Sequence, residues 1–391
     1  MSTIQLISES DCTGCMMCGD ICPSKAITYQ IKQGFWYPVV DENKCIECGI
    51  CLKKCPASKD ATYIKESPLK CYGVKSKNED TRYNSTSGGF FSELAQYWYK
   101  NGGYCVGAIY DSNNLIVHTL EKSSDGIAKL RQSKYAQSDI HGIYKIVKEK
   151  LVKGEKILFC GTSCQVEALY AFLGKEYQNL TTLDFICCGI CSPVVYRRYL
   201  DELEKKYCSK IKKVWFKNKK FGWRSVGVRV EFENGKAYMR PGTRDAFMAC
   251  FVKDALSMRE CCFSCKYRKT PHHSDFTLAD FWGIENVQPE IDDDKGISAV
   301  MVNSEKGKIL FDLIKGNLDY FETSVGDIAK GNFTVYSAKK PNDFRKEFLN
   351  MIEKKGFSMA VRKYSSYSGL NKLKIDMGFY KKIILEKIRG Y

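Results

Sequence analysis

Eight cysteines near the N-terminus form two copies of one spacing, and they constrain this chain more than any other feature. Each copy has two residues, two residues and three residues between successive cysteines and ends in Cys-Pro: Cys12, Cys15, Cys18 and Cys22, then Cys45, Cys48, Cys51 and Cys55. The whole chain has 391 residues and 20 cysteines. Secreted disulfide scaffolds are usually much shorter, so clustered cysteines in a chain of this length indicate metal binding.

The repeated run resembles the bacterial ferredoxins that hold two iron–sulfur clusters. In that pattern three closely spaced thiolates hold one 4Fe-4S cluster, and the fourth cysteine reaches across to the other cluster. The resemblance therefore implies one cluster on Cys12, Cys15, Cys18 and Cys55, and a second on Cys45, Cys48, Cys51 and Cys22. A pair of zinc sites is the alternative, but zinc ribbons pair two CxxC units across a longer gap.

From residue 71 onward the pattern alternates between helix and strand. Helical spacing covers 90–100, 140–153 and 193–207, and short apolar runs at 104–110, 156–160 and 183–187 predict buried strands. This alternation is typical of an α/β core. Residues 211–240 instead predict antiparallel strands, and 342–362 predict a helix. We therefore expect an α+β protein, in which a two-cluster ferredoxin fold is followed by an α/β body and a helical C-terminal appendage.

The expected units are a ferredoxin domain at 1–65, two parts of one body at 66–150 and 151–340, and a basic helical tail at 341–391. The polar segment 58–70 contains Pro68 and predicts a connector. The net charge is +16, and the tail from Lys339 onward has 14 Lys or Arg against 5 Asp or Glu. A basic tail suits an acidic partner, nucleic acid or lipid, but a solvated helical face explains it best, so we expect no nucleic-acid partner.

Three later segments combine cysteine with polar residues and glycine: GTSCQ (161–165), DFICCGICSP (184–193) and CCFSCKY (261–267). The first two follow predicted strands, where loops gather functional groups at the carboxyl ends of a sheet. Together they supply enough thiolates for one more cluster. The isolated Cys71, Cys105, Cys208 and Cys250 are expected to be small core residues.

Seven motifs in a fixed order resemble the beta subunit of coenzyme F420 hydrogenase/dehydrogenase. Besides the GTSCQ, ICCGICSP and CxxCKY segments, they are RYNSTSGGFFSEL (82–94), RQSKY (131–135), FKNKKFGWR (216–224) and SDFTLADFWG (274–283). The resemblance covers roughly residues 70–290 and implies that the body binds FAD and a third 4Fe-4S cluster. Carried over motif by motif, it implies Cys164, Cys187, Cys262 and Cys265 as ligands. Neighbouring thiols of Cys188, Cys191 and Cys261 leave that choice open.

Flavin contacts are expected where the motifs place glycines and hydroxyls at helix starts, because free backbone amides there suit a pyrophosphate. Lys134 is expected to stabilise the reduced flavin, and His273, beside His272, to donate a proton. The simpler alternatives are a helix cap and turn, a surface lysine and exposed histidines. The expected catalytic residues are Lys134 and His273, and the expected cofactor contacts are Ser85, Thr86, Ser87, Gly88, Gly89, Lys134, Tyr135, Gly161, Thr162 and Gln165.

These features predict an iron–sulfur flavoprotein oxidoreductase. It would take electrons from a ferredoxin or flavodoxin through three 4Fe-4S clusters to FAD and reduce a small organic substrate. The first alternative is a subunit of a hydrogenase or dehydrogenase complex that uses coenzyme F420 as substrate. The second is a non-enzymatic electron carrier. We expect a cytoplasmic protein without a transmembrane segment, because the N-terminus lacks a signal-peptide pattern and no apolar run reaches about 18 residues.

Overall fold

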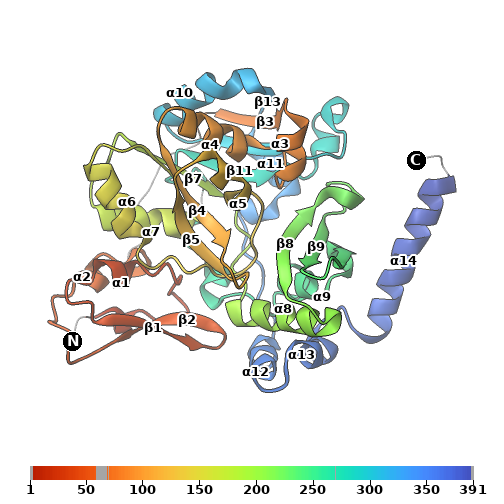
Figure 1. Cartoon of the computed structure of the whole chain (residues 1–391), viewed down its shortest axis with the longest axis horizontal. Coiled ribbons are helices and arrows are strands. Elements are labelled where there is room, and N and C mark those ends of the chain that lie inside the picture. The colour runs from red at the N-terminus through yellow and green to blue at the C-terminus, as the bar shows by residue number, and fades with distance from the viewer. Residues whose placement is uncertain (1–2, 59–67, 69, 269, 389–391) are drawn as a thin grey trace.

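The computed structural model describes residues 3–58, 68, 70–268 and 270–388 (Figure 1). Most of the predicted connector at 58–70 lies outside these ranges. The expected domain boundary between residues 65 and 66 lies outside them as well. Among the described helices, none has the length and apolar character needed to cross a bilayer.

The N-terminal module has the predicted ferredoxin-like character. Strands β1 (Ile27–Lys32) and β2 (Phe35–Val40) form an antiparallel hairpin, and α1 (Met17–Ile21) and α2 (Ile50–Lys53) are two short helices. Each helix begins just after the second cysteine of its run, at Met16 with φ 61° and Gly49 with φ 66°. These left-handed residues turn the backbone sharply, so three cysteines can point to one side of each loop.

The body is built on one sheet of eight strands. Their order across the sheet is β13-β3-β12-β11-β7-β6-β4-β5, and the four strands β11, β7, β6 and β4 run parallel. The strands are β3 (Lys70–Ser76), β4 (Tyr104–Tyr110), β5 (Ile116–Glu121), β6 (Ile157–Cys160), β7 (Leu180–Phe185), β11 (Phe276–Asp280), β12 (Ser298–Val302) and β13 (Leu318–Thr323). Strands from both expected parts of the body therefore share this sheet.

Helices cover both faces of this sheet, as the α/β pattern predicts. On one face α4 (Phe90–Lys100) and α10 (Glu305–Ile314) pack with Leu158 and Val300 in one buried cluster. On the other, α6 (Ile143–Val152) and α7 (Ser163–Leu173) pack with Ile157 and Phe159. The shorter helices α3 (Glu79–Asn84), α5 (Ile127–Leu130) and α11 (Val325–Gly331) complete the body.

A second core surrounds a small antiparallel sheet. It contains β8 (Ile211–Asn218), β9 (Gly227–Phe232), β10 (Ala237–Pro241), α8 (Pro193–Tyr207) and α9 (Ala246–Met248). The predicted C-terminal helical part is confirmed, but the helix expected at 342–362 is two helices, α12 (Arg345–Lys355) and α13 (Phe357–Tyr364). Gly356, with φ 84°, separates them. Both helices contribute to this core, whereas α14 (Gly369–Ile388) extends along one side of the molecule (Figure 1).

One strand differs from the sequence prediction in a way that matters for the site. The strand expected at 183–187 lies at 180–185, so Cys187 belongs to the loop beyond it. The polar residues of this strand hid its apolar pattern in the sequence. They are buried in the structure, where they form hydrogen bonds with the neighbouring strand and the segment before it. Thr182 donates from its backbone N–H to Asp275 at 2.8 Å, and Thr277 donates to Asp184 at 2.7 Å.

Gly88 provides a test of how closely the segment before α4 packs on the sheet. A Cβ at this position would lie 2.0 Å from the Val74 carbonyl oxygen and 2.7 Å from the Ser298 backbone nitrogen. We predict that Gly88→Ala lowers the free energy of unfolding by about 1–3 kcal/mol, the usual cost of overpacking a core. The control is Gly316→Ala, where a Cβ has open space. Equal thermal unfolding midpoints for the two variants would contradict this packing.

Candidate iron–sulfur and flavin site

The cysteines of the N-terminal run separate into two groups. We define the first thiol set as Cys12, Cys15, Cys18 and Cys55, and the second as Cys22, Cys45, Cys48 and Cys51. Burial raises the pKa of Cys18, and its thiol interacts electrostatically with Cys15, Cys12 and Cys55. The second set lines a separate cavity of about 350 Å³ with Gly49. The structure thus groups the thiols as the ferredoxin pattern predicts.

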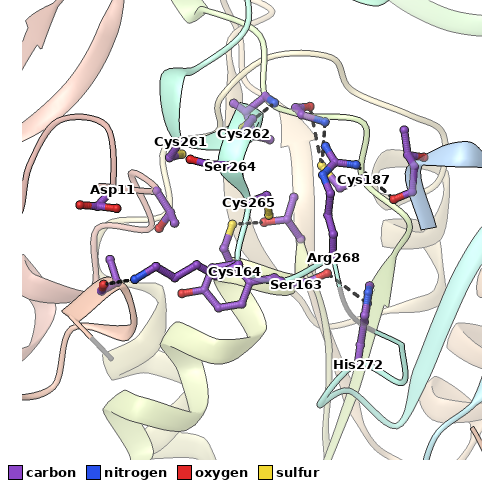
Figure 2. Close-up of a pocket in the computed structure, with 18 of the residues that line it drawn as sticks. Asp11, Ser163, Cys164, Cys187, Cys261, Cys262, Ser264, Cys265, Arg268 and His272 are labelled. Atoms are coloured by element: carbon purple, nitrogen blue, oxygen red, sulfur yellow. Dashed lines mark hydrogen bonds between the residues drawn. The ribbon is translucent and has the colours of Figure 1, made fainter. Parts of the chain in front are cut away.

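A third group of thiols converges in the body. We define the third thiol set as Cys164, Cys187, Cys262 and Cys265. Cys164 lies in the first turn of α7, Cys187 follows β7, and the other two lie on and just after a 3-10 helix at Glu260–Ser264. All four line one cavity of about 730 Å³, counting its open mouth (Figure 2). The sequence places them up to 101 positions apart, so only folding brings them together.

The neighbouring cysteines differ in how they relate to this cavity. Cys191 is fully buried and donates from its thiol to Ser257 Oγ at 3.2 Å, so it is held in the core beside the site. Cys188 is not part of the cavity wall. Cys261 does line it, and a hydrogen bond with Cys261 lowers the pKa of Cys262 to about 7. Of these three neighbours, only Cys261 lines the cavity together with the third set.

Backbone and side-chain donors surround the third set. Gly189 N–H lies 3.4 Å from Cys187 Sγ, Ile190 N–H lies 3.4 Å from Cys262 Sγ, and Thr162 Oγ1 lies 3.0 Å from Cys164 Sγ. Burial raises the pKa of the Cys164, Cys187 and Cys265 thiols. Such donors stabilise thiolates and tune the potential of an iron–sulfur cluster.

The cavity also contains polar groups that have no partner among the described residues. Tyr267 OH and Arg268 Nε are buried and face no acceptor there, and both residues line the cavity. Within the same described part of the chain, no three Cys, His, Asp or Glu side chains converge as closely as a single metal ion requires. Four cysteines around one cavity with unpaired donors fit a 4Fe-4S cluster in ligand chemistry.

The two adjacent histidines lie in different surroundings. His272 is buried, and its Nδ1 lies 2.8 Å from Asp184 Oδ2 and 3.1 Å from Ser163 Oγ. Burial alone would lower its pKa, but the Asp184 carboxylate outweighs this and the pKa is raised. His272 lines the cavity of the third set, whereas the expected proton donor His273 does not. His273 instead packs against Tyr170 with ring centroids 4.2 Å apart.

Most polar groups of the expected phosphate loop are already engaged within the protein. Ser85 Oγ donates to Thr81 O at 2.8 Å and Ser87 Oγ to Ile297 O at 2.6 Å. Gly88 N–H donates to Ser298 Oγ at 3.0 Å, and Gly89 has a φ of 98° where α4 begins. Thr86 contacts Ser133 at 3.2 Å, which joins this loop to the 131–135 loop.

Lys134 has an unexpected environment. Its ammonium donates to the backbone carbonyls of residues 129, 130, 131 and 132, at 2.8 to 3.3 Å, and so closes the C-terminal end of α5. Burial lowers its pKa to about 7. Tyr135 packs between Phe216 and Phe251, with ring centroids 5.4 and 5.7 Å away. Both side chains therefore already have partners within the protein, and their contact with a flavin stays a prediction.

The remaining expected contacts form a helix start. Gly161 ends the turn after β6, and Thr162 and Gln165 form a capping box on α7, with Thr162 N–H donating to Gln165 Oε1 at 2.9 Å. The capping box fixes the first turn of α7 and therefore the direction of Cys164. In the structure, Thr162 and Gln165 thus serve to position a cysteine of the third thiol set.

The FKNKK segment holds two buried lysines whose roles the sequence did not reveal. Lys219 donates to the carbonyls of Arg82 and Ser87 at 2.6 and 2.7 Å, and Lys217 forms an ion pair with Asp280. Arg82 in turn makes a bidentate contact with Asp293 at 2.7 and 2.5 Å. These contacts bind the 82–89 loop to the small sheet and to the 293–296 turn.

Two family comparisons agree with this geometry. Residues 11–59 match the 4Fe-4S dicluster domain, and residues 154–328 match the C terminus of the coenzyme F420 hydrogenase/dehydrogenase beta subunit. These two matches indicate an iron–sulfur electron-transfer protein. The chain combines a 4Fe-4S dicluster domain with the C-terminal domain of the F420 hydrogenase/dehydrogenase beta-subunit family, which confirms the resemblance seen in the motifs.

Other comparisons are more distant. A chain from the F420-reducing [NiFe] hydrogenase complex of Methanosarcina barkeri is 15% identical, with a TM-score of 0.42. That alignment covers 76% of this chain and 93% of the hydrogenase chain. Among curated proteins, no sequence matches significantly.

Adjacent cysteines allow a matched test of the third set. We predict that Cys187→Ser lowers the iron content of the anaerobically reconstituted chain by about four atoms, because one 4Fe-4S cluster loses a ligand. Cys188→Ser, one residue away and outside the cavity wall, is expected to keep the full content. Iron and acid-labile sulfide would be counted per chain. A loss in Cys188→Ser with none in Cys187→Ser would reverse the assignment.

Proposed function

We propose that the chain is an iron–sulfur subunit that exchanges electrons with a deazaflavin coenzyme of the F420 type, within a hydrogenase or dehydrogenase complex. The main support is that all four cysteines of the third set lie inside the segment that matches the F420 hydrogenase/dehydrogenase beta subunit. Under this proposal the third set holds a 4Fe-4S cluster and the N-terminal module holds two more. The larger complex would supply the electrons or take them up.

A flavin is part of the proposal because hydride exchange and cluster chemistry move different numbers of electrons. When bound, the 4Fe-4S clusters carry single electrons, and FAD exchanges two at once as a hydride. Two buried donors support a polar ligand near the 82–89 loop. Arg131 Nε and Trp215 Nε1 have no partner among the described residues. Both lie near the start of that loop, since Gln132, next to Arg131, donates to Asn84 O at 3.0 Å and the Trp215 ring lies 5.8 Å from that of Tyr83.

These donors change which residues we propose for the flavin. Lys134 holds a helix end, so Arg131 and Trp215 replace it as proposed contacts. Thr86 and Ser133 join the 82–89 loop to the 131–135 loop through a hydroxyl contact of 3.2 Å. The protein's role there would be to orient the ligand and exclude water, and the ion pair of Lys217 with Asp280 lies two residues from Trp215 in the sequence.

A second candidate follows from the fused N-terminal module. A chain that carries its own dicluster domain can accept electrons directly from a free ferredoxin or flavodoxin and reduce a small organic substrate. Both candidates use the same thiol sets and the same flavin region. They differ only in the donor and in the final acceptor.

The function can be tested with the reconstituted full chain under anaerobic conditions. With reduced ferredoxin as donor, we predict that the protein catalyses loss of the absorption of oxidised coenzyme F420. Cys187→Ser is expected to abolish turnover and Cys188→Ser to retain it. Absence of turnover in a chain with full iron and flavin content would rule out the deazaflavin proposal and favour the second candidate.

The flavin region can be tested separately. Trp215→Phe removes the indole N–H together with one ring of a buried side chain, and we predict that it weakens flavin binding by about fivefold to tenfold, the effect of one lost hydrogen bond. Bound flavin would be quantified after acid release, across a titration with FAD. The control is Trp98→Phe, since that indole belongs to α4 and packs in the core of the central sheet. An unchanged affinity in Trp215→Phe would place the flavin elsewhere.

A further inference from the structure

The N-terminal module meets the body through one of its two cysteine loops. Three body residues donate to backbone carbonyls of the first loop: Arg259 to Cys12 at 2.8 Å, Gln137 to Gly14 at 3.2 Å and Tyr144 to Cys15 at 3.0 Å. Lys266 also donates to the Ala57 carbonyl at 2.9 Å, two residues after Cys55. The body therefore holds the backbone at both ends of the first thiol set.

Further contacts fix the same side of the module. The buried Asp20 carboxylate accepts from the backbone N–H of Gly142 at 2.7 Å and of Tyr144 at 3.2 Å, where α6 begins. Met16 and Met17 are buried in the cluster formed by α6 and α7. The carboxylate at the start of α6 fixes the orientation of the module on the body. The two buried thioethers add apolar contact area between the module and the body.

The second loop has no such contacts. Within the described ranges, no recorded hydrogen bond or ion pair joins residues 45–51 to the body. Cys48 is exposed, and Ile46 beside it is 65% exposed. The two halves of a nearly symmetric module therefore have different surroundings. The first set faces the body and the second faces outward.

Arg259 connects the first and third sets directly. Its side chain is fully buried, donates to the Cys12 carbonyl, lies 3.5 Å from Cys12 Sγ through Nη2, and stacks over the Tyr37 ring at 4.2 Å. Its own carbonyl accepts from Cys262 N–H at 3.1 Å. One residue thus holds a ligand loop of each set, with a permanent positive charge between them.

The close approach depends on Gly14. A Cβ there would lie 2.2 Å from Gln137 Nε2 and 2.8 Å from an Arg259 Nη, and the residue has a φ of 70°. Asp11 and Thr13, on either side of Cys12, line the cavity of the third set (Figure 2). The first and third thiol sets are therefore neighbours across a wall of few side chains.

We infer that the N-terminal module is docked in one fixed orientation, with the first thiol set as the inner relay point to the third set and Arg259 as the residue that positions this pair. Electrons would enter at the exposed second set and pass through the first to the third, one at a time, without bond or proton changes. The inference rests on the proposed cluster content but not on the identity of the final acceptor. Arg259 is a positioning residue, and its charge stabilises the reduced, more negative state of both neighbours.

The order can be tested by electron paramagnetic resonance of the fully reduced full chain. Cys15→Ala and Cys48→Ala each remove a ligand from one set of the module. We expect spin–spin broadening of the third-set signal to disappear in Cys15→Ala and to persist in Cys48→Ala. Broadening that is lost only in Cys48→Ala, or that is absent in wild type, would overturn the docking order. Neither readout needs a substrate, so failure of the deazaflavin proposal would not affect it.

Arg259 can be tested without removing any ligand. In redox titrations of the full chain, we expect Arg259→Gln to shift a cluster potential to a more negative value and Arg259→Lys to restore most of the shift, because lysine keeps the charge. Arg244→Gln, a buried cation whose ion pair with Asp376 lies on the α14 side, is the control and should leave the potentials unchanged. If the lysine and glutamine variants lose thermal stability equally and neither shifts a potential, Arg259 serves only to hold the fold.

Discussion

The buried guanidinium of Arg259 is the contact on which the arrangement of this protein depends. Taking a cation out of water is costly unless every donor finds a partner. Here the carbonyls of Cys12 and Trp36 and the side chain of Gln137 accept from it, and two aromatic rings cover its faces. Because those partners come from both the module and the body, the two cannot separate without leaving a buried charge unpaired.

The central sheet positions two of the cysteines of the third thiol set. Strands β6 and β7 are parallel neighbours, so the loops that carry Cys164 and Cys187 leave the sheet at the same edge. The capping box of α7 and the Asp184 carboxylate, which binds His272, Ser274 and Thr277, fix this edge from the buried side. The segment at 259–265 then brings Arg259 and the last two thiols of the third set to the same place.

The sequence predicted the parts that local patterns encode. The cysteine spacing gave the two thiol sets of the module, and helical periodicity gave the helices at 90–100 and 193–207 with the bounds the structure has. The thiols of the third set were identified only through a family resemblance, since Cys187 and Cys188 are indistinguishable by composition. The structure separates them because only Cys187 lines the cavity.

What could not be predicted depends on contacts between distant positions. Arg259 lies 247 positions from Cys12, and nothing around it in the sequence distinguishes it from a surface arginine. Lys134 is the reverse case. Its motif suggested a flavin contact, but in the structure four backbone carbonyls at 129–132 accept hydrogen bonds from its ammonium. A sequence pattern gives the residue type but not the partner, and the partner decides the role.

The central claim is that one chain holds three iron–sulfur clusters, with the inner cluster of the module next to that of the body. The most direct measurement is an anaerobic redox titration of the full chain, followed by electron paramagnetic resonance with iron counted on the same samples. We expect about twelve irons per chain and three reduced centres, with a magnetic interaction between the first-set and third-set centres. About eight irons, or three centres that titrate without any interaction, would contradict it.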